Sequence, residues 1–448
     1  MSLLAKGIDL AQKVKHQFQD KIREHTPVYL SPVRRIAQVA TKERVCAMTF
    51  DDGPCRLPAN PDNFGGKPLT LVLAETLEKY GAKGTFNVVG DTSGNYPDVV
   101  GQHGSTSWCG ASYDHYPDFG KDSQGGIVHC PELVGRLLDG GHEIASHTYA
   151  HVPFGWNPLV CDRRHYLPDL DAVMDDLKKL HSTMRDQWEY SVHFSKPPRG
   201  ADTINGGYSS YDALGLMGYQ YVSAGFDGAG RAPLTNYDAE VEATWRPIEK
   251  HLKEDPNYFC GQIICQKDGY NMARRSPVAD GLVQQLDLLK RYGYRVVTVS
   301  ELMSISPVCD VMPDSHVGKA AARLLERNWC VAYRDNSIRP DQFLTRGELA
   351  MMGYGWTAVS RRVSILREKI SPFKDLSYKH PYAAAAKLAV DDGALAAPDG
   401  RFCPDDMATP YDVSQFCISL LGKYPKLGTP ENMTHGEFIL LAASLLNE

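Results

Sequence analysis

Short runs of apolar, β-branched and aromatic residues alternate along the first two thirds of the chain with longer stretches in which apolar residues recur every three or four positions. The short runs indicate buried strands and the longer stretches indicate amphipathic helices. The predicted strands cover residues 45–50, 85–89, 142–146, 192–196, 219–224, 261–265 and 294–299. The predicted helices cover residues 69–80, 131–139, 168–186, 208–217, 238–253 and 277–292. Because strands that alternate with helices form parallel sheets, this pattern predicts an irregular seven-stranded (β/α) barrel over residues 44–305.

The first 43 residues lack this alternation. Leu4, Ile8, Ala11 and Val14 recur at helical spacing with charged residues between them, which predicts an amphipathic N-terminal helix followed by a linker. We expect this helix to pack across the barrel rather than to lie on a membrane. The interspersed charges interrupt the apolar core that a signal peptide needs, so we expect none here and a cytoplasmic location stays open.

Residues 306–448 change to a mainly α-helical pattern that contains an internal repeat. Two pairs of segments match at an offset of about 64 residues, which predicts two repeats of one structural unit, and one further match predicts a truncated third. The matched segments are 307–311 with 372–376, 338–341 with 402–405, and 344–348 with 433–437. We therefore predict a smaller C-terminal repeat domain.

Composition narrows the class of protein. The chain has 448 residues, too many for one ordinary domain, and its net charge of −6 argues against a nucleic-acid-binding protein. No run approaches the roughly 18 apolar residues of a membrane-spanning helix. Eleven cysteines occur without a C-x-x-C pair, so neither a zinc ribbon nor a disulfide framework is indicated. We interpret Cys46 and Cys265, in strand-like runs, as small core residues.

Two clusters of metal-binding residue types follow predicted strands. Asp51 and Asp52 come directly after the first strand, and His147 and His151 follow the third. Adjacent carboxylates at the end of a buried strand are costly unless a cation or a proton lies between them. Histidines four residues apart on a helical turn can bind one ion, and one Asp with two His leaves a coordination position open, as in a catalytic site.

Further polar groups follow the later strands. In a (β/α) barrel the active site lies at the carboxyl ends of the strands. Residues 196–199 follow the fourth predicted strand, Asp227 the fifth, and Lys267 with Asp268 the sixth. We therefore expect these side chains to converge on one mouth of the barrel. The long polar insertion 91–127 is expected to form a functional loop above it.

The strings T-F-D-D-G-P (49–54) and H-T-Y-A-H (147–151) resemble the first two motifs of the NodB-homology polysaccharide deacetylases, also called carbohydrate esterase family four. The resemblance extends over residues 44–304 and agrees with a barrel fold. It implies a hydrolase that removes acetyl groups from an N-acetylated or O-acetylated polysaccharide or oligosaccharide, with Zn²⁺ as the expected divalent metal. By this resemblance Asp52, His147 and His151 hold the metal, and Asp51 is the catalytic base.

The other motifs depart from the family pattern. Lys196 stands near the place of the arginine that orients the base, and Arg199 stands in the aromatic position, where it could supply the cation instead. Asp227 matches the acidic residue that supports the site. Lys267 replaces the histidine that acts as general acid. A lysine with its ordinary pKa near ~10.4 is a poor proton donor at neutral pH, although burial beside a metal would lower that pKa.

These departures leave two other classes of function open. A catalytically degenerate barrel would retain only glycan or cell-wall binding, and Lys267 is the residue that favours it. A ferrous oxygenase also uses two histidines and one carboxylate. It gives no reason for Asp51 beside Asp52, and the barrel pattern argues against it.

The C-terminal repeats resemble S-layer homology repeats, whose T-R-A-E turn is nearly matched at residues 345–348. This resemblance implies binding of cell-wall polysaccharide through Arg346 and a location at the cell surface or outside the cell. Pro410 and His435 occupy the arginine position in the other two copies. The alternative is that the repeats only pack against the barrel.

Overall fold

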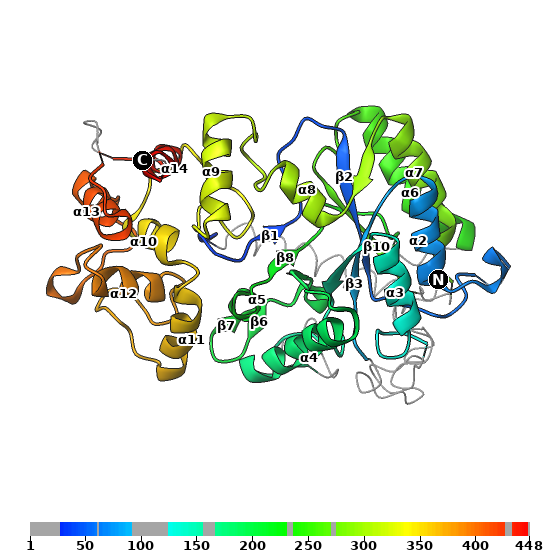
Figure 1. The fold of residues 1–448 in the computed structure, drawn as a ribbon, viewed down its shortest axis with the longest axis horizontal. Helices are drawn as coiled ribbons and strands as arrows, with labels where there is room; N and C mark the ends of the chain where they lie inside the picture. The colour runs from blue at the N-terminus through cyan, green and yellow to red at the C-terminus, as the bar shows by residue number, and fades with distance from the viewer. Residues whose placement is uncertain are drawn as a thin grey trace, which may run out of the picture.

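The structure is a computed structural model that describes residues 27–60, 62–91, 124–155, 166–230, 236–269, 275–425 and 432–446. The predicted N-terminal helix and residues 92–123 of the polar insertion lie outside the described residues. In Figure 1 the barrel and the helices around it lie on the right, and the C-terminal helices lie on the left. Among the helices of the described ranges, none is both long enough and apolar enough to cross a membrane.

A curled parallel sheet forms the centre of the barrel, and all seven predicted strands are present in it. Its order is β1-β8-β5-β4-β3-β2-β10-β9, with β11 added on β2. The strands are β1 (Arg35–Ile36), β2 (Val45–Asp51), β3 (Thr85–Val88), β4 (Glu143–Ser146), β5 (Phe194–Ser195), β8 (Gln220–Val222), β9 (Phe226–Asp227), β10 (Ile263–Lys267) and β11 (Arg295–Val297). The prediction of an α/β barrel fold is confirmed. The sequence missed β1 and β9, which have two residues each.

The curl brings the chain after β1 against the start of β10. Gln38 and Gln262 form a bridge, and the N–H of Val39 donates to the carbonyl of Gly261 (2.9 Å). In the same place the N–H of Ile263 donates to the carbonyl of Ala37 (3.0 Å). Residues 35–36, which the sequence pattern assigned to a linker, are therefore part of the barrel wall.

Strand β2 is paired on both edges and determines which residues face the site. Ala47 is in register with β10 on one edge and β11 on the other, and Thr49 is in register with β10 and β3. Side chains alternate along a strand. Met48 and Phe50 pack in the core beneath the surrounding helices, whereas Val45 and Ala47 pack in a second core within the barrel. Asp51 lies an even number of residues after Val45 and Ala47, so its side chain faces the barrel interior at the mouth.

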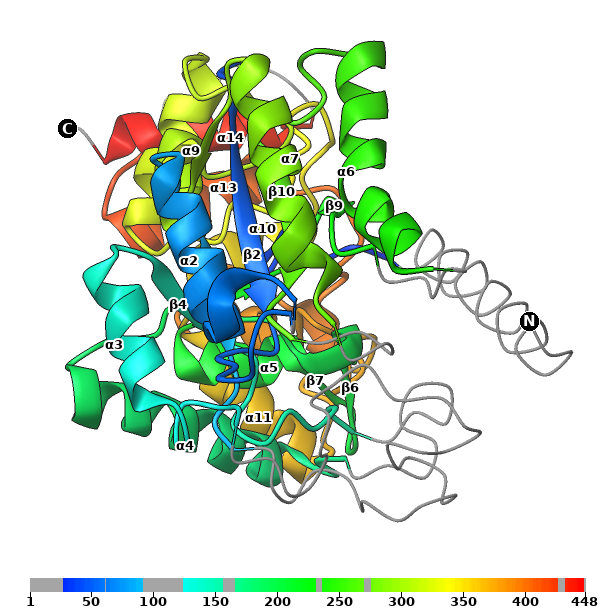
Figure 2. The same ribbon diagram turned by 90° about the vertical axis from the view of Figure 1, so that its right-hand side faces the viewer.

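Helices cover the outside of the sheet, as Figure 2 shows for α2, α6 and α7. The barrel helices are α2 (Leu69–Lys79), α3 (Pro131–Asp139), α4 (Leu170–Trp188), α5 (Ser210–Met217), α6 (Tyr237–Glu254), α7 (Pro277–Arg291) and α8 (Val299–Ile305). Residues 208–209, predicted as the start of a helix, instead form β7 (Tyr208–Ser209), which pairs with β6 (Thr203–Ile204). Ser209 then caps α5 through a capping box with Asp212.

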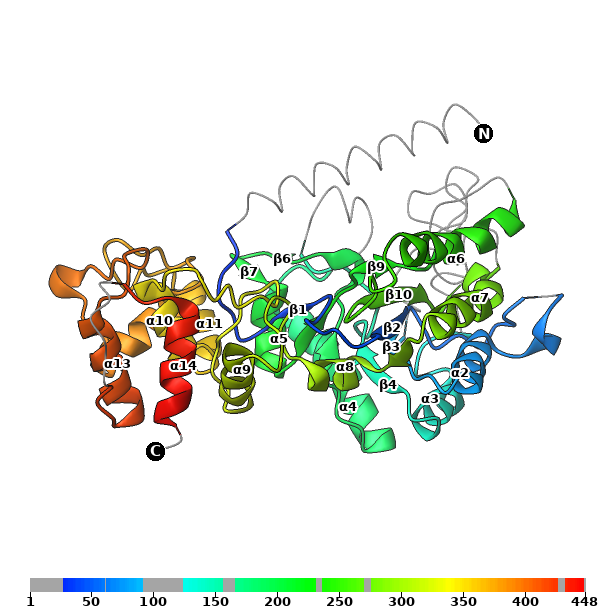
Figure 3. The same ribbon diagram turned by 90° about the horizontal axis from the view of Figure 1, so that it is seen from above.

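The C-terminal region has its own apolar core and lies beside the barrel in Figure 3. Its helices are α9 (His316–Glu326), α10 (Arg346–Tyr354), α11 (Ala358–Glu368), α12 (Ala383–Asp391), α13 (Pro410–Leu421) and α14 (His435–Leu445). The matched segments form the same hydrogen bonds. Asp310 accepts two backbone N–H groups, from residues 338 and 339 (2.8 and 2.7 Å), and Asp375 accepts two from residues 402 and 403 (2.9 and 2.8 Å).

Arg346, the residue expected to bind the cell wall, contacts other residues of this region. Arg346 forms an ion pair with Asp412 of α13 and donates from Nε to the carbonyl of Phe402 (3.0 Å). The corresponding His435 lies with Nε2 3.1 Å from Glu348. In both places the first side chain of one helix meets an acidic residue in the first turn of another. These contacts give Arg346 a packing role, while wall binding stays a prediction.

Candidate active site

Asp51 ends β2 with both carboxylate oxygens engaged. Asn87 Nδ2 donates to Oδ1 (2.7 Å) and Lys196 Nζ donates to Oδ2 (2.6 Å). Asn87 is the partner of Asp51 in the β2–β3 register, so the sheet itself brings the amide there. The carboxylate is buried, and a cation held against it favours its ionised form. Lys196 therefore lies where it can orient Asp51.

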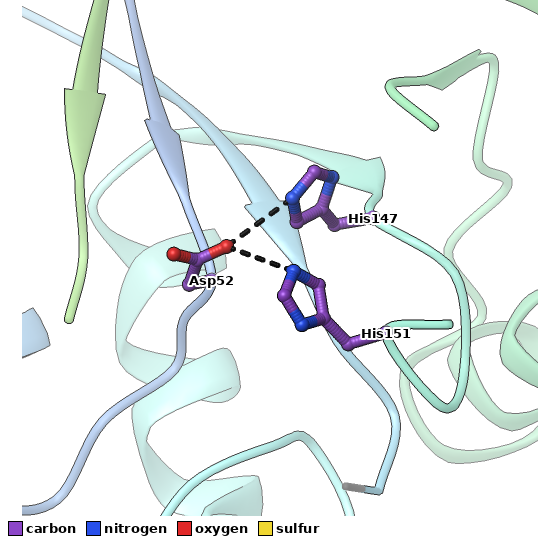
Figure 4. A group of neighbouring side chains, drawn as sticks. All are labelled: Asp52, His147 and His151. Atoms are coloured by element: carbon purple, nitrogen blue, oxygen red, sulfur yellow. Dashed lines mark ion pairs between the residues drawn. The ribbon is translucent and has the colours of Figure 1, made fainter. Parts of the chain in front are cut away.

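Asp52, His147 and His151 meet at one point (Figure 4). Asp52 Oδ1 lies 3.2 Å from Nε2 of each histidine, and the three groups offer ligand atoms within 4.8 Å of one another. Asp52 leaves the strand with a left-handed backbone (φ 80°), which turns its side chain away from the direction that Asp51 takes. The adjacent carboxylates thus enter two different environments.

The hydrogen bonds of His147 prepare it to bind a cation. Its Nδ1 lies 2.5 Å from the carbonyl oxygen of Lys196. Because a carbonyl only accepts, Nδ1 carries the proton, and in a neutral ring Nε2 then has a lone pair. That lone pair faces Asp52 Oδ1, which is also an acceptor. Two acceptors at this distance require a proton or a cation between them, and a metal ligated by histidine usually has this arrangement.

The charges of the site support neutral histidine beside ionised aspartate. Burial lowers the pKa of His151 below its usual value, opposed by Asp52 and assisted by the charges of His147 and Arg199. Burial alone would raise the pKa of Asp52, but the ammonium of Lys267 and the two histidines hold it well below its usual value. The donor set of one carboxylate and two imidazoles fits a divalent ion such as zinc, with room for a fourth ligand.

Lys267 lies beside this centre, as expected from its place at the end of β10. Its Nζ is 3.5 Å from Asp52 Oδ2, and the side chain is buried. Lys267 is the register partner of Asp51 in the β2–β10 pair, so strand pairing fixes its position. The ammonium therefore lies within reach of a group bound by the aspartate and the histidines.

The two remaining predicted residues lie nearer the surface. Arg199 is exposed in the turn Pro198–Gly200 with a left-handed backbone (φ 58°), close enough for its charge to affect the pKa of His151. Asp227 is exposed on β9, where Oδ1 accepts the N–H of Ala229 (3.0 Å). Arg199 thus lies near His151. Asp227 is the last residue of β9.

Comparison with known proteins agrees with this geometry. Residues 38–222 match the model of the polysaccharide deacetylase family. The match begins just after β1 and ends with β8. A peptidoglycan-N-acetylglucosamine deacetylase of Bacillus cereus is 25% identical over 269 residues, which are 59% of this chain and 91% of that protein. Both matches support the predicted resemblance to this family and the predicted enzyme class, a hydrolase.

Two of the solved structures found by comparison are a chitin deacetylase and a pseudoenzyme. A chitin deacetylase of Colletotrichum lindemuthianum is 20% identical, with a TM-score of 0.38, over 62% of this chain and 92% of that one. A CE4 family pseudoenzyme from Bacillus anthracis is 14% identical, with a TM-score of 0.39, over 61% of this chain and 70% of that one.

The site contains a further polar contact at Asp51 that the sequence did not indicate. Cys265, interpreted as a core residue, is buried, but its Sγ lies 3.0 Å from Lys196 Nζ and 3.3 Å from Asp51 Oδ2. Cys265 has the same strand parity as Lys267 and faces the same interior. That parity is the signal that could have placed it in the site.

Asp268 supports the segment that carries Asp51 and Asp52 through hydrogen bonds on its far side from the site. Both of its oxygens accept from Thr70 Oγ1 (2.9 and 2.7 Å), and its N–H donates to the carbonyl of Asp51 (2.7 Å). A Cβ on Gly53 would lie 1.9 Å from Asp268 Oδ2, so the motif needs glycine at this position. Burial raises the pKa of Asp268 to about 8.

This raised pKa predicts how the stability of the metal-free protein depends on pH. The folded state binds the Asp268 proton more tightly than the unfolded state, whose pKa is near 3.8. The stabilisation is complete below that value and is lost as pH rises toward about 8. The free energy of unfolding of the wild type should therefore fall relative to Asp268→Asn across this range, as measured by urea denaturation. Parallel curves for the two proteins would contradict the assignment.

Proposed function

We propose that this chain removes acetyl groups from N-acetylated sugar residues of a cell-surface or environmental glycan, using a divalent metal, zinc by preference, held by Asp52, His147 and His151. The observation that carries the proposal is the pair of acceptors that face each other, His147 Nε2 and Asp52 Oδ1, in a centre with a second histidine. The polysaccharide deacetylase match provides the reaction class.

The chain's own residues are arranged for hydrolysis of an acetamide. A bound divalent ion supplies Lewis-acid polarisation of the acetyl carbonyl and activates water. Asp51 lies next to the ligand Asp52 and takes the proton of the attacking water as general base. Asn87 and Lys196 hold its two oxygens, so the carboxylate keeps one orientation during the transfer. The products are acetate and a free sugar amine.

Lys267 has one of two roles in this reaction. As a general acid its Nζ gives a proton to the departing amine. As a fixed cation it stabilises the negative charge that develops on the acetyl oxygen without losing a proton. Its 3.5 Å contact with Asp52 supports either role.

The second candidate is a barrel that binds acetylated glycans without hydrolysing them. The observation that favours it is that the ammonium of Lys267 already forms an ion pair with Asp52, the charged ligand of the metal centre. A bound metal and this ammonium then compete for the same carboxylate.

Acetate release decides between the two candidates. Purified protein loaded with Zn²⁺ is incubated with N-acetylglucosamine oligomers, peptidoglycan fragments and O-acetylated xylan, and acetate is measured enzymatically. If the chain is a deacetylase, we expect acetate release that stops when the metal is chelated and returns when zinc is added. Binding of a glycan without acetate release from any of the three would favour the degenerate barrel.

A further inference from the structure

A buried carboxylate outside every motif contacts the segment that joins the two histidines. Asp176 lies in the interior of α4, and its Oδ1 accepts the N–H of Tyr149 (2.6 Å) while Oδ2 accepts the N–H of Ala150 (2.9 Å). The side chain is buried, and burial raises its pKa to about 6, against the two N–H groups and Lys179, which lower it. Burial of a carboxylate is unfavourable, so its retention here points to a need for both acceptors.

The segment held by Asp176 has an unusual backbone conformation. Thr148 and His151 both have left-handed backbones, with φ of 71° and 54°, which residues other than glycine rarely adopt. Such conformations persist only where the surrounding contacts fix them. The two N–H groups bonded to Asp176 belong to the two residues between Thr148 and His151, so the carboxylate holds the middle of the turn.

A second set of contacts holds the same turn from the opposite side. The carbonyl of Tyr149 accepts the N–H of Gly90 (2.8 Å) and of Asp91 (2.7 Å). The Tyr149 ring packs so closely on Gly90 that a Cβ there would lie 2.2 Å from it, and Lys179 Nζ lies 4.0 Å from the ring centre. Residues 149–150 are thus fixed between α4 and the chain that follows β3.

The two histidines depend on this turn to different degrees. The N–H of His147 donates to the carbonyl of Val88 (2.8 Å), and its Nδ1 is fixed by Lys196. The position of His147 therefore follows from the sheet. His151 comes after the turn, so its distance from His147 and Asp52 follows from the turn.

We propose that Asp176 is a positioning residue for the metal centre: it holds the turn at residues 149–150 and so sets the place of His151 relative to His147 and Asp52. This inference rests on the proposed function, in which those three residues hold the ion. Asp176 touches neither the ion nor the substrate in this proposal. Its loss should weaken metal binding through His151 alone.

The test measures zinc affinity by competition with a chromophoric chelator. Asp176→Asn keeps the size of the side chain but offers one acceptor oxygen and sets an NH₂ group against a backbone N–H. We expect its zinc affinity to fall about 10- to 100-fold, as for other residues that support metal ligands. Asp175→Asn is the matched control, because Asp175 is the neighbouring carboxylate on the same helix and is exposed. It should bind zinc as the wild type does.

A double-mutant comparison separates positioning from general loss of structure. If Asp176 acts through His151, then adding Asp176→Asn to His151→Ala should cause no further loss of zinc affinity. Losses that multiply would overturn the proposal. Asp176→Glu keeps the charge and both acceptors but moves them by one methylene, so it should retain the fold with a smaller loss of affinity.

The controls also separate this inference from the function beneath it. A wild type that binds no zinc overturns both. A wild type that binds zinc stoichiometrically, with Asp176→Asn and Asp176→Glu equal to it, overturns the positioning role and leaves the metal centre intact.

Discussion

Alanine at Asp52 or His147 should remove stoichiometric zinc from the protein, whereas Asp51→Asn should keep the zinc and lose turnover. Asp52 and His147 provide two of the three ligand atoms that lie within 4.8 Å of one another, and two remaining ligands hold an open site weakly. Asp51 points elsewhere, toward Asn87 and Lys196, so its amide analogue removes the base and leaves the ligands. We expect kcat to fall about 10²- to 10⁴-fold in Asp51→Asn.

Elemental analysis and acetate release on the same preparations check this result. Asp171→Asn, at the exposed start of α4, is the control for loss of a carboxylate and should match the wild type in both measurements. Full zinc occupancy in both alanine variants would show that the ion is held elsewhere. Full activity in Asp51→Asn would show that another group takes the proton.

Lys267→Ala should lower kcat about 10²- to 10⁴-fold with a smaller change in KM, because the lysine acts on the leaving amine or the acetyl oxygen rather than on the rest of the glycan. Lys267→Arg and Lys267→His distinguish the two roles. Arginine keeps a fixed cation but does not give up a proton, while histidine restores a donor with an ordinary pKa near ~6.5. Activity in the arginine variant alone supports a fixed cation, and activity in the histidine variant alone supports a general acid.

The same series tests whether the barrel has kept its catalysis. Lys178→Ala, on the exposed face of α4, is the control for loss of a lysine and should leave kcat unchanged. If the wild type releases no acetate and Lys267→His does, the chain has retained the deacetylase scaffold without its activity. If Lys267→Ala equals the wild type, the lysine has neither role.

The strands and the mouth could be predicted because they depend on patterns that lie within a few residues of one another. The alternation in residues 45–50 identifies a buried strand, and a parallel sheet brings the residues that follow each strand to one edge. The predicted ligands and Lys196 meet for this reason. Asp227 was expected to follow the strand predicted at residues 219–224, but it lies on the separate short strand β9.

The supporting residues could not be predicted because they depend on register and on packing between distant segments. Asn87 reaches Asp51 only because β2 and β3 pair residue for residue, and Cys265 does so through the β2–β10 register. Asp176 lies on a predicted amphipathic helix, but the sequence does not show that this part of the helix contacts residues 149–150. The role of Arg346 was assigned by resemblance, whereas its partners come from a segment more than fifty residues away.

The segment that precedes the barrel has a consequence for attempts to divide the protein. Leu30 is buried in the core of the C-terminal region, and the N–H of Ser31 donates to the carbonyl of Ala332 (3.2 Å). Arg34, buried a few residues later, donates to the carbonyl of Pro307 (2.6 Å) and to Asn336 (3.0 Å). A fragment that began at residue 306 would therefore lack the side chain of Leu30 in its core. The helical region could be transferred to another protein only together with residues 27–34.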